Sequence, residues 1–262
     1  MQNRVLFSSL LPALMVIISV CSPWRTYWQS KSPTNTEKTT ATVPFIGCAS
    51  DGQTGPVNAP AGQARHLPTS TETAAHLAYY ASAQKLGVLA PRGWFCFGTY
   101  GSNGAALYVS PQPFDAKNVL SAKWRGFSGP AIELSLNSGE TSGRFAVAHV
   151  IARVFPTRKA FADGVISEGI EPASSFAFGP YPADQLVYKS KDLVEYRTPA
   201  RADGLGTQSR LQKNDAPISG VAILTGEAPD VVFLAVRLPL DLQQLSQGIV
   251  EQVERDIAIA NP

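Results

Sequence analysis

The feature that most constrains the fold of this chain is a set of three pairs of apolar segments. A turn of only two to four residues joins the two segments of each pair. The pairs occupy residues 93–109, 185–198 and 220–238, and the turn of the last pair is Gly-Glu-Ala-Pro. Two consecutive strands can run parallel only if a connection of roughly a dozen residues crosses between them. Turns this short therefore predict antiparallel hairpins.

One further strand and several helices complete the predicted fold. Residues 130–137 alternate apolar and polar side chains, the pattern of a half-buried strand, and VVFLAV within 230–238 is apolar on both faces, as in a central strand. Helical spacing predicts four helices, listed here: Thr69–Leu86, Phe145–Phe155, a shorter one through Phe161 and Val165, and a C-terminal helix with Asp241 as N-cap. We expect residues 43–262 to form a single α+β domain, a mainly antiparallel sheet with three to four packed helices.

The start of the chain has the pattern of an export signal. Residues 1–4 carry a positive charge, and the 17 residues from Val5 to Cys21 hold no charged side chain. A positive region followed by an apolar run of this length is typical of a signal peptide or a membrane anchor. We assign residues 1–22 to that segment and residues 23–42, rich in Ser, Thr and Pro, to a flexible polar tether.

Three fates of this segment stay open. Cys21 closes the apolar run, and the region resembles the lipobox of bacterial lipoproteins, although Val20 stands where that motif has a small residue. Ser19-Val20-Cys21 also fits a small-x-small cleavage site. We favour a cleaved signal or an uncleaved anchor over lipidation at Cys21. An uncleaved or lipidated segment would make the membrane a partner of the protein.

The two other cysteines, Cys48 and Cys96, predict a disulfide. Export into an oxidising compartment favours their pairing. The alternative is a pair of buried free thiols.

The charge of the chain is concentrated in its leader. Residues 1–42 hold four basic side chains and one acidic side chain, a net charge of +3, so the rest of a chain with formal charge +2 carries −1. A nucleic-acid-binding protein needs clustered Lys and Arg to displace phosphate counterions. The near-neutral body excludes nucleic acid as an expected partner.

No catalytic, cofactor or metal site emerges from the motifs. The three histidines, His66, His76 and His149, fall in no zinc-binding pattern. Ser128 lies in Gly-Phe-Ser-Gly-Pro, which lacks the second glycine of a nucleophile elbow, and Ser82 to Lys85 matches S-x-x-K only by chance.

Two functional hypotheses follow. The first is a non-catalytic cell-envelope domain that binds a small molecule or a protein of unknown identity. The aromatic side chains of Trp94, Phe95, Phe97 and Tyr100 could line a binding surface, although core packing suits a strand better. The second is an exported hydrolase with an unrecognised serine or carboxylate site, which could involve Ser128 and His149. The scarcity of motifs favours the first.

The export prediction is checked by mass spectrometry of the mature protein isolated from its native host. We expect the protein outside the cytosol. An intact Met1 would contradict cleavage, and a free Cys21 thiol would contradict lipidation.

Overall fold

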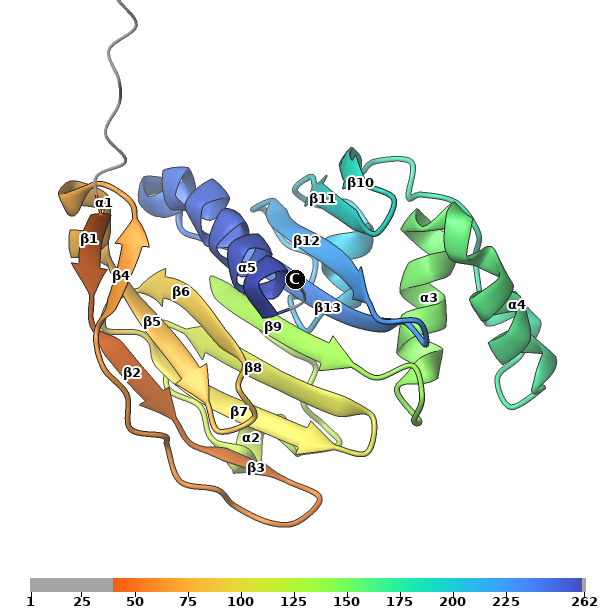
Figure 1. Cartoon of the computed structure of the whole chain (residues 1–262), viewed down its shortest axis with the longest axis horizontal. Coiled ribbons are helices and arrows are strands. Elements are labelled where there is room, and N and C mark those ends of the chain that lie inside the picture. The colour runs from red at the N-terminus through yellow and green to blue at the C-terminus, as the bar shows by residue number, and fades with distance from the viewer. Residues whose placement is uncertain (1–39, 261–262) are drawn as a thin grey trace, which may run out of the picture. The chain divides into compact units, whose positions relative to one another are not determined.

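The computed structural model describes residues 40–260 (Figure 1). The predicted signal or anchor at 1–22, and with it Cys21, lies outside the described residues, as does most of the predicted tether. Thr40, Ala41 and Thr42, predicted as tether, instead belong to a strand, because Ala41 and Val43 alternate into the core. Within residues 40–260, no helix is long and apolar enough to cross a membrane.

An eight-stranded sheet organises the domain, in the order β10-β11-β12-β13-β9-β8-β7-β3. Its strands in chain order are β3 (Ser50–Gly52), β7 (Phe95–Gly101), β8 (Gly104–Ser110), β9 (Ala131–Asn137), β10 (Gln185–Ser190), β11 (Leu193–Thr198), β12 (Ile218–Thr225) and β13 (Asp230–Arg237). Every neighbouring pair is antiparallel except β3 and β7. The three predicted hairpins are confirmed as β7–β8, β10–β11 and β12–β13, and β13 is an interior strand.

Two smaller sheets lie beside the large one. The first pairs β1 (Thr40–Val43) with β4 (Arg65–Pro68). The second has the order β2-β5-β6 and consists of β2 (Phe45–Cys48), β5 (Leu77–Ser82) and β6 (Gly87–Pro91). In it β2 and β5 run parallel.

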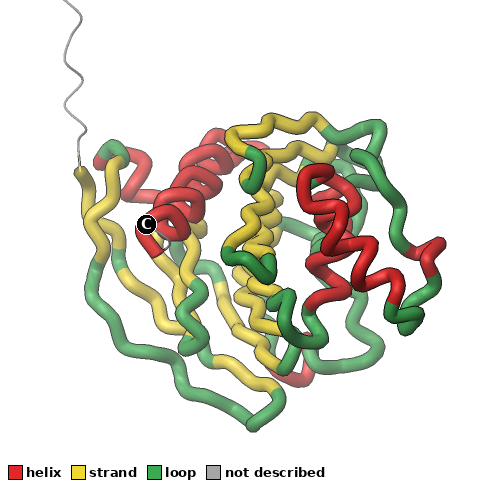
Figure 2. The backbone as a smooth tube through the Cα atoms, turned by 45° about the vertical axis from the view of Figure 1, so that its right-hand side comes forward, coloured by secondary structure: helices red, strands yellow, loops and turns green. Residues whose placement is uncertain are grey.

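The large sheet is covered on both faces, which Figure 2 shows with helices on either side of the strands. On one face, Leu107, Ile132 and Leu234 pack in one core cluster with β5, β6 and α5 (Ser246–Ala260). On the other, Ala222 and Phe233 pack with α3 (Arg144–Val154) and α4 (Lys159–Ser167). The architecture is therefore α+β and mainly antiparallel, as predicted.

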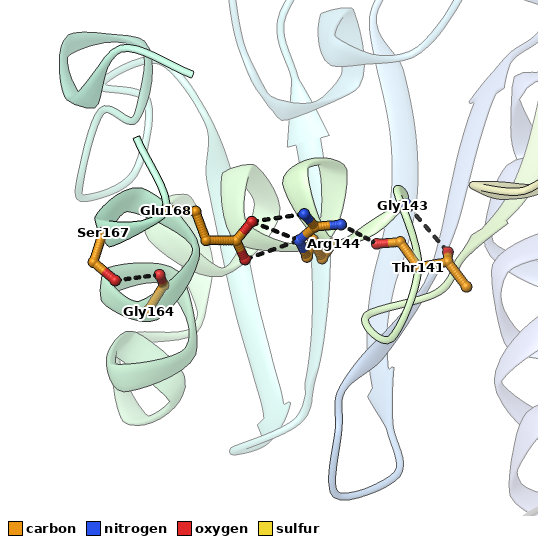
Figure 3. Close-up of polar contacts among 6 residues, drawn as sticks. All are labelled: Thr141, Gly143, Arg144, Gly164, Ser167 and Glu168. Carbon is orange, nitrogen blue, oxygen red and sulfur yellow. Dashed lines mark hydrogen bonds and ion pairs between the residues drawn. The ribbon is translucent and has the colours of Figure 1, made fainter. Parts of the chain in front are cut away.

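A fork of hydrogen bonds joins the start of α3 to the end of α4 (Figure 3). The Arg144 guanidinium donates through Nε to Glu168 Oε1 at 2.9 Å and through Nη2 to Glu168 Oε2 at 2.6 Å, and its Nη1 donates to the carbonyl of Thr141 at 3.0 Å. The pairing raises the pKa of Arg144 and lowers the pKa of Glu168. Exposed ion pairs stabilise little, so the contribution of this pair to the free energy of unfolding is small.

The predicted helix over 69–86 is wrong beyond its first turns. Helix α1 spans only Thr71–His76, with Ser70 as its N-cap, and the chain then continues as β5. Four consecutive side chains at the start of β5, Leu77 to Tyr80, are buried. A surface helix buries only one stripe, so a segment buried on all sides can adopt the strand conformation despite its helical propensity.

The C-terminal helix begins later than predicted. Leu240–Leu245 forms a 3₁₀ helix that contains Asp241, and α5 starts at Ser246, so Asp241 does not cap it. Leu245, Ile249 and Val253 are buried and form the apolar stripe of this segment. With α1 and the four-residue α2 (Ala116–Val119), the described part of the chain has five α-helices rather than three to four.

The Cys48–Cys96 disulfide is confirmed. It joins the end of β2 to β7, and so links the small three-stranded sheet to the large one. Because Cys48 and Cys96 are 48 residues apart in sequence, the bond removes many conformations from the unfolded chain.

We expect the Cys48→Ala/Cys96→Ala double variant to lose roughly 4 kcal/mol of unfolding free energy, since a closed loop of this length is worth about that much in the chain-entropy model. Urea denaturation of both proteins measures the difference. A double variant as stable as the wild type would contradict the structural role of the bond.

Candidate functional site

The face of the large sheet that packs against α3 is apolar on one side and polar on the other. On the β12–β13 side it is apolar, with Ala222, Phe233 and Ala235 in the core cluster of α3. On β9, the three side chains that follow Ala131 on the same face are polar: Glu133, Ser135 and Asn137. Because successive strand residues point to opposite faces, the alternation in 130–137 that predicts a half-buried strand also assigns these polar residues to one side.

A cleft of about 750 Å³ lies over this polar half of the sheet. Its floor is formed by β7, β8 and β9, one wall by α3, and the opposite wall by the segment around residues 208–210. The side chains that the following argument uses are Tyr108, Glu133, Ser135, Asn137, His149, Arg153, Tyr181, Gln208 and Arg210.

Glu133 is the buried acid of the cleft floor. It is only 7% exposed, and its Oε2 accepts a hydrogen bond from the backbone N–H of Arg210. Burial raises the pKa of Glu133 to about 7, although the Arg210 backbone and guanidinium oppose the rise. Tyr108 lies directly across on β8, and burial together with the Glu133 charge raises the pKa of that phenol. The carboxyl group therefore changes charge near neutral pH.

Two arginines make the walls of the cleft cationic. The Arg153 guanidinium lies 3.8 Å from the ring centre of Tyr181 and donates to the Gly179 carbonyl at 3.3 Å. Arg210 lies 5.7 Å from the ring centre of Trp124. Among the ion pairs of residues 40–260, none involves Arg153 or Arg210. Both can therefore bind an anion without breaking an existing salt bridge.

His149 lies in the cleft wall on α3. Its Nε2 is 2.9 Å from Glu171 Oε2, and its ring stacks on Phe176 with centres 4.2 Å apart. These two contacts hold the imidazole in place.

Ser128 does not join His149. It is exposed, lies outside the cleft lining, and its carbonyl accepts from Asn214 Nδ2 at 2.6 Å. The structure therefore does not assemble the Ser128 and His149 pair that the hydrolase hypothesis considers. Ser82 ends β5 and Lys85 lies in the turn before β6, so neither residue is on a helix.

The remaining histidines lie in other parts of the fold. His66 Nδ1 is 3.0 Å from Thr42 Oγ1 between β4 and β1, and His76 ends α1. Among the described residues, no group of three or more His, Cys, Asp or Glu side chains could hold a metal ion.

The aromatic residues of 94–100 do not form a common surface. Tyr100 lines the cleft, Trp94 packs against the core, and Phe95 is 48% exposed. A different aromatic cluster borders the site: Tyr108, Trp124 and Phe127 have ring centres 5.3–5.9 Å apart.

A buried arginine fixes the segment that carries Arg210. Arg237, 1% exposed at the end of β13, donates to the carbonyls of Phe127, Gly129 and Gln212. Burial lowers the pKa of Arg237 to about 10. Because buried carbonyls need donors, Arg237 holds two loops together beneath the cleft.

Sequence reasoning missed Glu133, Arg153 and Arg210 as site residues. The one available signal was a carboxylate on the polar side of an alternating strand, a side that the half-buried pattern alone assigns to solvent. Comparisons of the chain with family models, curated proteins and solved structures found no match. Inference about function therefore rests on the cleft.

We expect Glu133→Gln to change the pH dependence of stability. The folded pKa of Glu133, about 7, lies above its ordinary value of 4.5. The folded state therefore binds a proton more tightly than the unfolded state, and the associated stability is present below pH 4.5 and lost as pH rises through 7. Relative to the variant, the wild type should lose roughly 3 kcal/mol of unfolding free energy between pH 4.5 and pH 8.

Denaturant titrations at several pH values measure this difference, with Glu140→Gln as a control at an exposed position. Parallel pH profiles for the wild type and Glu133→Gln would show that the carboxyl group does not titrate as described.

Proposed function

We propose that this protein is an exported cell-envelope binding protein whose ligand site is the cleft over β8 and β9. The observation that carries the proposal is the convergence in one cleft of a buried carboxyl group, Glu133, and two arginines without salt-bridge partners among the described residues. Small-molecule sites are commonly concave and contain a few convergent polar groups beside apolar surface.

The size and lining of the cleft support a small ligand. Its volume of about 750 Å³ lies within the range of roughly 300–1,000 Å³ that is common for such sites. Aromatic and aliphatic surface from Tyr108, Ala106 and Phe233 accompanies the polar groups. This combination provides both apolar contact and orientation.

The disulfide supports the proposed compartment. Bonds of this kind persist in oxidising environments and are rare in the cytosol. The charge and hydropathy of residues 1–22 agree with export, and a retained or lipidated segment would tether the binding domain to a membrane.

A hydrolase with a carboxylate site is the second candidate, favoured by Glu133 alone. A carboxyl group with a pKa of about 7 is suited to general acid catalysis at neutral pH. Within the lining of the described cleft, however, Glu133 is the only carboxylate, whereas glycoside hydrolysis commonly uses two. A binding function therefore explains more of the residues that line the cleft than a catalytic function does.

The variant Ala146→Trp tests the location of the site. Ala146 is a half-buried residue of α3 in the cleft lining, and an indole there would fill part of the cleft. A screen of sugars, organic acids and amino acids identifies compounds that raise the thermal unfolding midpoint of the wild type. We expect these compounds to bind the variant at least about tenfold more weakly, a loss of about 1.4 kcal/mol of binding free energy.

Ala160→Trp is the matched control, because Ala160 is an exposed residue of α4 outside the cleft. Equal binding to both variants would place the ligand elsewhere. Turnover of an ester, peptide or glycan that Glu133→Gln abolishes would favour the hydrolase instead.

A further inference from the structure

We infer that the cleft recognises a small hydroxylated anion, a molecule such as an acidic sugar in which one oxyanion accompanies several hydroxyl groups. The inference rests on the proposed function and specifies its ligand. Arg153 and Arg210 are assigned to the oxyanion, and the polar side chains of β9 to the hydroxyl groups.

The cationic part of the site is held in place before a ligand arrives. The Arg153 guanidinium lies over the ring of Tyr181, and the Tyr181 hydroxyl accepts from Gln208 Nε2 at 2.6 Å. These contacts connect α3 with the segments around residues 181 and 208 across the cleft. A guanidinium held in one orientation suits carboxylate or phosphate, because its parallel N–H groups can bind two oxygens at once.

The polar part of the site lies on β9. Ser135 and Asn137 point to the same face as Glu133, and the structure of residues 40–260 provides neither side chain with a hydrogen-bond partner. Ser135 is nevertheless only 9% exposed. A hydroxyl and an amide can each both donate and accept, as the hydroxyl groups of a sugar do. Both side chains line the cleft, so a ligand there can supply the hydrogen bonds that the protein does not, which favours a ligand rich in hydroxyl groups.

The protonation state of Glu133 affects the binding of an anionic ligand. The charged and titratable groups that interact with it are Tyr108 from β8, Tyr196 from β11 and Arg210 from the opposite wall. His149 and Arg153 from α3 line the same cleft. A protonated Glu133 can donate to the ligand, whereas its carboxylate would repel a bound anion. Because burial raises the pKa of Glu133 to about 7, affinity for an anion should fall as pH rises above neutrality.

Calorimetric titration with matched ligands tests the inference. The probes are glucuronate and galacturonate against methyl glucoside and methyl galactoside, with glucose 6-phosphate as the phosphate arm. We expect at least one acidic probe to bind roughly 10- to 100-fold more tightly than its neutral counterpart, the range expected for a charge-assisted hydrogen bond. The comparison of carboxylate and phosphate arms identifies the oxyanion.

Variants separate the roles of the residues. Arg153→Met and Arg210→Met should each weaken the acidic probe about tenfold or more. Arg125→Met is the control, an exposed arginine outside the cleft. Glu133→Gln should bind the acidic probe with little change between pH 6 and pH 8, because the variant lacks the carboxyl group that changes charge in this range.

Different results would contradict the anionic ligand and the location of the ligand site in the cleft. Equal affinity for acidic and neutral probes, or wild-type affinity in both arginine variants, would overturn the assignment of an anion. If Ala146→Trp still abolishes binding of some other compound, the cleft remains the ligand site. If no compound of any class binds in a manner sensitive to Ala146→Trp, both proposals are wrong.

Discussion

The structure depends on the need to cover both faces of one large sheet. Strand β13 is buried along its length, so it requires apolar partners above and below. Helix α5 with β5 and β6 supplies one cover, and α3 with α4 supplies the other. The core cluster of α3 includes residues of β9, β11, β12 and β13 but none of β7 or β8. The cleft occupies the part of the sheet that this second cover leaves open.

The two arginines of the cleft lack the salt bridges that several other arginines of residues 40–260 form. Arg144, Arg65 and Arg158 each pair with a carboxylate. Arg153 and Arg210 form no salt bridge among residues 40–260, and the aromatic rings near their guanidinium groups leave the positive charge in place. A cation that keeps its charge in a concave site favours an anionic ligand, and the neighbouring Glu133 makes that preference sensitive to protonation.

Patterns in the sequence predicted an element correctly where the apolar residues of that element recur with one clear period. The three hairpins, β9 and α3 were all predicted, because each has one clear apolar periodicity. The helix predicted over 69–86 failed because β5 is buried on all sides, so its alanines and tyrosines carry no decisive period. The site was missed for a related reason. Arg210 lies in an aperiodic stretch and meets Glu133 from 77 positions away, a distance at which local patterns say nothing.

The sequence by itself determined the antiparallel hairpins and the near-neutral charge of the body, since each follows from residue type and spacing. It identified Cys48 and Cys96 as disulfide partners only on the expectation of export, and the structure decided between that bond and two free thiols. Only the tertiary structure decided that Glu133 lies buried in a cleft rather than on a solvent-facing strand surface. It also decided that two arginines from α3 and a distant loop face the same cleft. The physical reason is that burial and electrostatic environment depend on which elements pack together, and the long-range contacts that bring those elements together leave no periodic trace in the chain.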